Sequence, residues 1–207
     1  MFSNDQLSTA LILFVKNPEL GKVKTRLAKD AGDENALKIY KALLGHTREI
    51  TVDLPLDRLL YYSTWIEEND EWDETQFKKR LQKGDDLGSR MSNAFAEAFN
   101  QYERVLIIGS DCAQLNEQMI EHAIEQLKFY PFVIGPSEDG GYYLLGMQKF
   151  TPSVFEDIPW STKEVLLHTL DRIRDLEASY YLLPKLSDID YLEDWKKHGW
   201  PIEGVEI

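Results

Sequence analysis

The sequence has few of the features that several large functional classes need. Its 207 residues include one cysteine, Cys112. A helix needs about 20 consecutive apolar residues to cross a bilayer, and the sequence has no apolar run of that length. Basic residues are outnumbered by acidic ones, 23 to 36, so the net charge is −13. One cysteine excludes an internal disulfide framework, and the acidic balance disfavours binding to nucleic-acid phosphates. Residues 1–6 also lack the basic start of a secretory signal. We therefore expect a cytoplasmic protein with no nucleic-acid partner and no membrane span.

The cations that are present gather in one short segment. Residues 16–29 contain five basic residues and one acidic residue, Glu19. The segment directly follows an apolar run, TALILFV, and is broken by Pro18 and Gly21. It lacks the glycine spacing of a Walker loop. Lysine point charges and an arginine fork nevertheless suit a diphosphate, and this is our interpretation; the alternative is a solvated basic face.

Apolar runs typical of buried strands alternate with segments of helical spacing. This alternation predicts an α/β fold with a single domain over residues 1–207, in which a mostly parallel, twisted sheet carries helices on both faces. Ligands of such sheets bind outside the carboxyl ends of the strands. The expected strands are residues 9–15, 58–63, 104–109, 132–134, 142–146 and 180–183. The expected helices are residues 34–51, a helix after Gly88, one capped by Asn116, one from a Ser161–Glu164 capping box to Ile173, and residues 190–197. The acidic stretch 65–74 is expected to be a surface loop or short helix that Trp65 and Trp72 anchor to the body.

A carboxylate follows the strand at residues 104–109. Asp111 at this position is suited to hold a hard divalent cation, because Mg²⁺ prefers one or two carboxylates together with phosphate oxygens of the substrate. The alternative is that Asp111 caps the following turn. The neighbouring Cys112 is expected to be a small buried residue rather than a nucleophile.

Two further segments carry candidate site residues. In SEDGGYY, Gly140 and Gly141 would let the backbone approach a ligand, and Tyr142 could border a base or sugar; a simple hairpin turn is the alternative. Near the end of the chain, Asp188 and Asp190 could complete a metal site, although Asp190 could equally cap a helix.

Several of these segments together resemble one family. FVKNPELGKVKTRLA, QKGDDLGSRM, IIGSDCAQL, GPSEDGGYYLLG and PWSTKEV occur in this order between residues 11 and 167. As a set they resemble a bacterial family of GT-A-type nucleotide-diphospho-sugar transferases, associated by name with glycosyltransferases of arsenosugar biosynthesis. The wider superfamily includes the guanylyltransferases of molybdenum-cofactor and phospholactate chemistry. One departure is clear, because Ala113 and Gln114 stand where the family usually has Pro and Asp.

The resemblance implies a metal-dependent glycosyltransferase with a nucleoside-diphosphate-sugar donor, a small-molecule acceptor, and Mg²⁺ or Mn²⁺ as cofactor. Nucleotidyl transfer to a phosphorylated small molecule and a non-catalytic nucleotide-sugar binder are the alternatives. The expected catalytic residues are Asp139, which would orient or deprotonate the acceptor, with Lys24 and Arg26. The expected metal ligands are Asp111, Asp188 and Asp190. The expected nucleotide and substrate contacts are Lys16, Gly21, Lys22, Lys24, Thr25, Arg26, Gly140, Gly141 and Tyr142.

Overall fold

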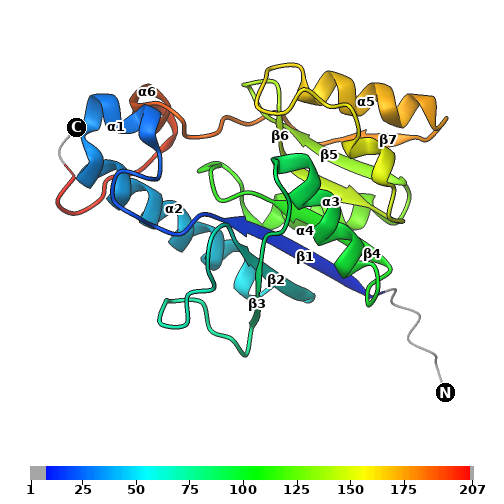
Figure 1. The fold of residues 1–207 in the computed structure, drawn as a ribbon, viewed down its shortest axis with the longest axis horizontal. Coiled ribbons are helices and arrows are strands. Elements are labelled where there is room, and N and C mark those ends of the chain that lie inside the picture. The colour runs from blue at the N-terminus through cyan, green and yellow to red at the C-terminus, as the bar shows by residue number, and fades with distance from the viewer. Residues whose placement is uncertain (1–7, 206–207) are drawn as a thin grey trace.

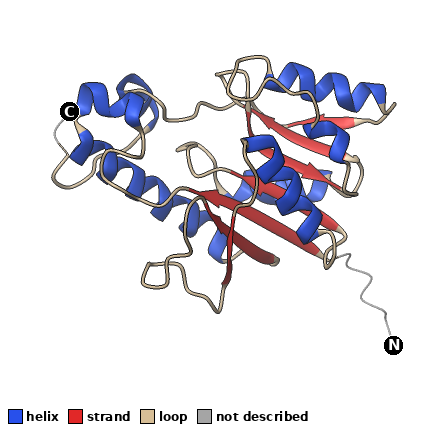
Figure 2. Cartoon of the chain, viewed as in Figure 1, coloured by secondary structure: helices blue, strands red, loops and turns tan. Residues whose placement is uncertain are grey.

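The computed structural model describes residues 8–205, and its centre is one seven-stranded sheet in the order β3-β2-β1-β4-β6-β5-β7 (Figures 1 and 2). The first six residues, which bear on the expected lack of a signal segment, lie outside this range. The strands are β1 (Thr9–Val15), β2 (Asp57–Tyr62), β3 (Phe77–Leu81), β4 (Arg104–Ile108), β5 (Phe132–Pro136), β6 (Tyr142–Met147) and β7 (Tyr180–Leu182). The helices of the described chain are α1 (Thr25–Ala31), α2 (Asp33–Val52), α3 (Leu87–Ala98), α4 (Glu117–Gln126), α5 (Val165–Asp175), α6 (Leu192–His198) and a 3₁₀ helix, η1 (Pro152–Phe155).

The sheet is mostly parallel, as the sequence predicts. β1 lies between β2 and β4 and runs parallel to both, while β3 is parallel to β2 and β7 is parallel to β5. β6 is antiparallel to β5, because the short turn at residues 137–141 returns the chain beside the strand it has left. β6 is also antiparallel to β4 on its other side. The starts of β6 and the ends of β1, β2, β4 and β5 therefore meet at one edge, which we call the carboxyl edge.

Helices cover both faces of the sheet, which confirms the predicted layers. On one face, alternate residues of the central strands pack against α2 and α4. On the other face, the intervening residues pack against α3, η1 and α5. This division follows from the strand period of two, which turns successive side chains to opposite faces.

A smaller apolar cluster holds α1, the first half of α2 and α6 together. Leu27, Ile39 and Trp195 are buried in it. Figure 1 shows these helices gathered beyond the end of β1, away from the strands. We call this group the helical lobe. It carries the start of α1 and the segment that precedes α6 to the carboxyl edge.

Three elements of the described chain were not predicted: β3, α1 and the short η1. β3 is an edge strand with the sequence FKKRL, in which only Phe77 is buried, so it lacks the apolar pattern of a buried strand. α1 begins at Thr25, inside the segment expected to be a loop, after Lys24 adopts a left-handed conformation with φ 48°.

The helix caps divide into one correct and two wrong predictions. Asn116 caps α4 by accepting a hydrogen bond from the Met119 N–H at 2.9 Å, as predicted. The Ser161–Glu164 capping box is wrong, because Ser161 has φ 64° and α5 begins only at Val165. The alternative cap at Asp190 is also wrong, because α6 begins at Leu192 and the Asp194 carboxylate accepts from the N–H groups of Asp190 and Tyr191.

Candidate functional site

Residues 16–26, which we call the basic loop, leave the sheet at the end of β1. Two polar side chains, those of Tyr40 and Asn17, hold the start of this loop. The Tyr40 hydroxyl, from α2, accepts a hydrogen bond from the Lys16 N–H at 2.8 Å and lies 3.3 Å from the Ser110 hydroxyl. Asn17 is 2 % exposed and binds the backbone just after β2. The ends of β1, β2 and β4 are therefore joined before any ligand is considered.

Lys24 lies at the centre of the charged groups. Its side chain is only 5 % exposed, and its Nζ lies 2.6 Å from Asp111 Oδ1 and 3.8 Å from Asp190 Oδ1. The left-handed backbone at Lys24 turns the chain into α1 and carries this side chain back to the sheet. The structure thus brings together three residues that the sequence predicts for one site.

Arg26 extends the same network into solvent. Its Nη1 lies 2.8 Å from Asp190 Oδ2, and its guanidinium stacks on the Tyr191 ring at 5.9 Å from the centroid. The Arg26 side chain is 58 % exposed, so its donors remain accessible to an anion. Lys16, Gly21, Lys22 and Thr25 are also exposed.

Asp111 follows β4. Its backbone is bound to the C-terminal segment, because the Ile189 N–H donates to the Asp111 carbonyl at 2.8 Å. Burial raises the pKa of the Asp111 carboxyl, but the adjacent Lys24 ammonium and the charge of Lys16 outweigh it and hold the pKa below its ordinary value. Asp111 is therefore ionised at neutral pH.

Asp188 has the opposite electrostatic environment. Burial raises the pKa of its carboxyl to about 7, and the negative charges of Asp111, Asp139 and Asp190 add to the shift while Lys24 opposes it. The four acids thus act on one another at the carboxyl edge. The cations nearby do not fully compensate them at Asp188.

The turn between β5 and β6 is built by the Asp139 carboxylate. Its Oδ1 accepts hydrogen bonds from the Ser137 hydroxyl and from the Gly141 N–H, the latter at 2.9 Å. Gly140 has φ 91°, and a Cβ there would lie 2.1 Å from the Lys163 carbonyl oxygen. The close backbone approach at Gly140 is therefore made to the segment before α5, which accounts for this glycine without a ligand.

Tyr142 lies on the face of the sheet that packs against α3. Its hydroxyl is 3.9 Å from the Met91 sulfur, and its ring packs against the cluster that includes α5. Burial raises the pKa of the Tyr142 hydroxyl. A contact of Tyr142 with a base or sugar stays a prediction.

The departure from the family pattern has a structural counterpart. Gln114 Oε1 accepts a hydrogen bond from the Ser187 N–H at 3.2 Å, and Ala113 packs against the helical lobe. Gln114 therefore helps to hold the segment that carries Asp188 and Asp190. Cys112 is buried as expected, and its pKa is raised to about 12 by burial and by Asp188.

Two residues of the site were missed at the level of sequence. Asn17 and Tyr40 contribute no charge, and their roles are hydrogen bonds to distant backbone. The position of Asn17 directly before Pro18 at the end of a buried strand was the only available signal.

A divalent cation fits this set of carboxylates only if the bound substrate supplies part of its coordination shell. Within residues 8–205, no three His, Cys, Asp or Glu side chains are arranged to hold a metal by themselves. Mg²⁺ commonly takes one or two carboxylates and completes its shell with phosphate oxygens and water. The uncompensated repulsion at Asp188 is the feature of this structure that a cation would relieve.

Comparisons with known proteins agree with the fold. A family described as uncharacterized proteins conserved in bacteria (DUF2064) matches residues 47–162. A candidate nucleotide-diphospho-sugar transferase from Desulfovibrio desulfuricans G20 is 33 % identical, with 88 % of this chain and 82 % of that chain covered and a TM-score of 0.82. A comparison with curated proteins found no match.

More distant solved structures share the fold alone. The inositol-1-phosphate CTP transferase from T. maritima is 15 % identical, with 97 % and 98 % of the two chains covered and a TM-score of 0.58. Rv0371c from Mycobacterium tuberculosis H37Rv, solved in complex with manganese, is 12 % identical, with 93 % and 97 % covered and a TM-score of 0.53. Over residues 8–205, every helix is too short or too polar to cross a membrane.

Proposed function

The chain belongs to the DUF2064 family of proteins conserved in bacteria, and we propose that it is a metal-dependent glycosyltransferase that uses a nucleoside-diphosphate sugar. The observation that carries this proposal is the contact of the buried Lys24 ammonium with Asp111, beside Arg26 and Asp190. The name of the Desulfovibrio desulfuricans relative adds support for a nucleotide-sugar donor.

The donor's diphosphate would lie over the basic loop. Arg26 and Lys22 are exposed there and offer a planar fork and a point charge to phosphate oxygens. Lys24 would share its charge between Asp111 and the phosphates. Gly21 has φ 71°, so the loop turns here without the strain that a side chain would bring. Lys16 and Thr25 would contact the same phosphates.

Asp111, with Asp188 and Asp190, would hold Mg²⁺ or Mn²⁺ next to the diphosphate. When bound, the cation would neutralise charge on the departing nucleoside diphosphate. Lys24 and Arg26 would neutralise the rest, because a diphosphate leaving group gains negative charge as its bond to the sugar breaks.

The acceptor would approach from the turn between β5 and β6. Its hydroxyl oxygen forms the new bond to the anomeric carbon, the bond from that carbon to the diphosphate breaks, and the hydroxyl proton passes to a base. Asp139 is our candidate base. Its Oδ1 is oriented by Ser137 and Gly141, so the carboxylate is held in one position before the acceptor binds. Gly140, Gly141 and Tyr142 would border the acceptor.

Nucleotidyl transfer is the second candidate. The basic loop offers more cations than a diphosphate needs, with Lys16, Lys22, Lys24 and Arg26 all within one short segment. A triphosphate would use them, and a phosphate of the second substrate would then displace pyrophosphate.

A ligand panel followed by product analysis tests these alternatives. Nucleoside-diphosphate sugars and nucleoside triphosphates are compared in thermal shift with Mn²⁺; a ligand at 100 times its Kd stabilises the fold by about 2.7 kcal/mol. Release of a nucleoside diphosphate with an acceptor supports glycosyl transfer, whereas release of pyrophosphate supports nucleotidyl transfer. Binding without turnover of any donor would identify a non-catalytic binder.

Asp139→Asn is the sharpest variant for the catalytic proposal. The amide oxygen can still accept both hydrogen bonds of the turn, so the substitution removes the charge and keeps the geometry. We expect turnover to fall by about 10²–10⁴ with donor affinity nearly unchanged. Glu138→Gln, at the exposed neighbouring acid, is the matched control and should retain full activity. Equal rates for the two variants would remove Asp139 from the mechanism.

A further inference from the structure

The two tryptophans in the loop between β2 and β3 have different environments. Trp72 is 5 % exposed and packs edge-to-face on Phe77 at 4.8 Å, so it anchors the loop as the sequence predicts. Trp65 is 40 % exposed and does not anchor the loop through burial. A large aromatic side chain left this exposed at the carboxyl edge needs another explanation.

The backbone of Trp65 is fixed to the basic loop. Asn17 Nδ2 donates to the Trp65 carbonyl at 2.9 Å, and Asn17 Oδ1 accepts from the N–H groups of Thr64 at 3.1 Å and Trp65 at 3.4 Å. Asn17 directly follows Lys16, whose charge acts on Asp111. Trp65 is therefore positioned by the same asparagine that shapes the start of the proposed phosphate site.

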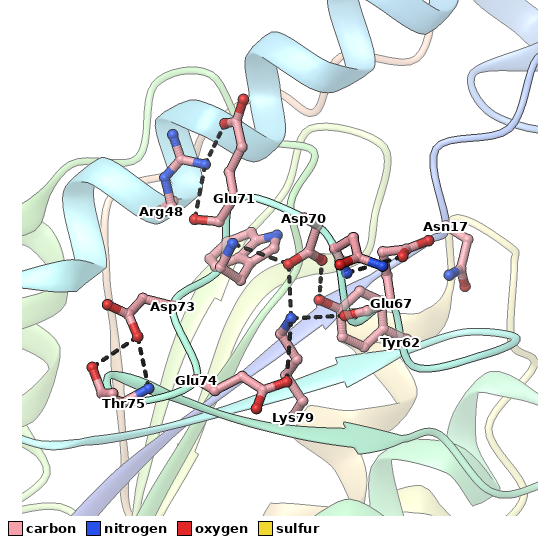
Figure 3. A network of polar contacts seen from close by, with 12 residues as sticks. Asn17, Arg48, Tyr62, Glu67, Asp70, Glu71, Asp73, Glu74, Thr75 and Lys79 are labelled. Carbon is pink, nitrogen blue, oxygen red and sulfur yellow. Dashed lines mark hydrogen bonds and ion pairs between the residues drawn. The ribbon is translucent and has the colours of Figure 1, made fainter.

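The rest of the loop is attached to the sheet by a network of polar contacts (Figure 3). Lys79, from β3, is 5 % exposed and donates to Asp70 at 2.9 Å and to the Glu67 carbonyl at 2.7 Å. The Tyr62 hydroxyl, at the end of β2, donates to the same Asp70 carboxylate. The Glu67 carboxylate lies 3.4 Å from the Trp65 indole nitrogen and restrains the ring.

The location of Trp65 separates it from the acceptor side. Tyr62 pairs with Val15 in the β1–β2 register, so the loops after these two strands are neighbours. The Asp139 turn lies beyond β4, at the β5–β6 end of the same edge. A nucleotide with its phosphates on the basic loop would find an ordered aromatic surface on the β2 side.

We propose that Trp65 is the stacking platform for the base of the bound nucleotide. The inference rests on the proposed function, because it takes the diphosphate to lie on the basic loop. Stacking uses the π-face that every base has, so Trp65 contributes affinity without choosing one base. The hydrogen bonds of Trp65 to Asn17 and Glu67 place the ring before the nucleotide binds, which reduces the entropy cost of binding.

The test compares a nucleotide with a base-free anion. Binding of UDP, GDP, CDP, ADP and inorganic pyrophosphate, each with Mn²⁺, is measured by calorimetry on the wild-type protein, Trp65→Ala and Trp65→Phe. We expect Trp65→Ala to weaken the best nucleotide by at least about tenfold, Trp65→Phe to weaken it much less, and pyrophosphate binding to stay unchanged in both. Phe129→Ala is the matched control, because Phe129 is 69 % exposed after α4, at the opposite edge of the sheet.

Each other outcome is informative. Unchanged nucleotide affinity in Trp65→Ala overturns the inference and leaves the phosphate site intact. Equal losses for nucleotide and pyrophosphate overturn it too, because they assign Trp65 to the shape of the loop. A wild-type protein that binds pyrophosphate as tightly as any nucleotide has no base site. A wild-type protein that binds none of these ligands removes the proposed function together with the inference.

Discussion

Asp188 illustrates how a single residue reports on its surroundings. The pKa of an aspartate in an unfolded chain is about 3.9, and in the folded protein burial and the nearby acids raise the pKa of Asp188 to about 7. Between these two pH values the folded state binds more protons than the unfolded state. The contribution of this carboxyl to the free energy of unfolding is therefore largest below about pH 4 and is lost as the pH rises to about 7.

The corresponding prediction concerns Asp188→Asn, which cannot ionise. In EDTA, we expect the variant to gain stability over the wild type as the pH increases from 5.5 to 8.5, by on the order of 1–3 kcal/mol at the upper end. Urea unfolding at four pH values measures this difference. A difference that is constant over this range would contradict the raised pKa. Added Mn²⁺ should stabilise the wild type at pH 7.5 and stabilise Asp188→Asn less.

The Lys24–Asp111 pair gives a second prediction at this scale. Lys24 is almost fully buried, so Asp111→Asn leaves its ammonium with Asp190 alone, 3.8 Å away. We expect a loss of about 1–3 kcal/mol, because an unpaired buried charge is costly. Each kcal/mol lowers the Tm by about 2–4 °C in a chain of this size.

The double variant Lys24→Met/Asp111→Asn isolates the pair from other effects. Without the ammonium, the second substitution should cost less than it does alone, so the cycle should show coupling of about 1 kcal/mol or more. Asp85→Asn, at an exposed acid in the turn before α3, controls for the change in net charge. Additive losses in the cycle would argue against the pair as a source of stability.

At the scale of elements, the capping of α4 and α5 gives a matched comparison. Asn116 accepts from the Met119 N–H, so Asn116→Ala should cost about 1 kcal/mol. Ser161 lies outside α5 and caps nothing at its start, so Ser161→Ala should change stability by less than about 0.5 kcal/mol. Chemical unfolding of both variants checks the pair. A loss for Ser161→Ala equal to that for Asn116→Ala would restore the capping box.

Strands differ in how well their sequences predict them. β1 and β4 are buried on both faces, and their continuous apolar runs identify them. β3 lies at the edge of the sheet, and its three central positions are basic, so its sequence shows no such run. Its membership in the sheet depends on pairing with β2 and on Lys79 reaching the acids of the preceding loop.

At the scale of the whole molecule, the helical lobe supplies basic as well as acidic residues of the site. Lys24 and Arg26 lie at the start of α1, and Asp188 and Asp190 lie just before α6. Trp195 is 5 % exposed between these helices, and its ring lies 5.0 Å from that of Trp200 at an interplanar angle of 57°. The lobe therefore couples the basic loop to the acids of the C-terminal segment.

Trp195→Ala tests this coupling. We expect amide exchange in α1 and α6 to accelerate by about tenfold or more, while β1 and β4 stay protected, because the cavity lies in the lobe rather than in the main core. Nucleotide affinity should fall in parallel. Leu167→Ala, at an exposed position on α5, should change neither quantity. Faster exchange throughout the sheet would show that the lobe and the sheet unfold as one unit.

The sequence alone determined the positions of the buried strands along the chain, the α/β class and the edge at which the candidate residues meet. These properties depend on local patterns: apolar runs, helical spacing, and breaks such as Pro18 and Gly21. Topology then requires that segments following parallel strands share an edge, so the loop at Lys16 and the end of β4 at Asp111 were correctly brought together.

Only the tertiary structure decided what each charge contacts. Lys24 is paired with Asp111 because a left-handed turn and the packing of α1 return its side chain to the sheet. Asp139 holds a turn, and Gly140 lies close to Lys163. The pKa of Asp188 is raised by burial and by acids that include Asp111 and Asp139, from two other segments. Such contacts join residues far apart in the chain, and the energy of a charge depends on burial and on those partners, neither of which a local pattern contains.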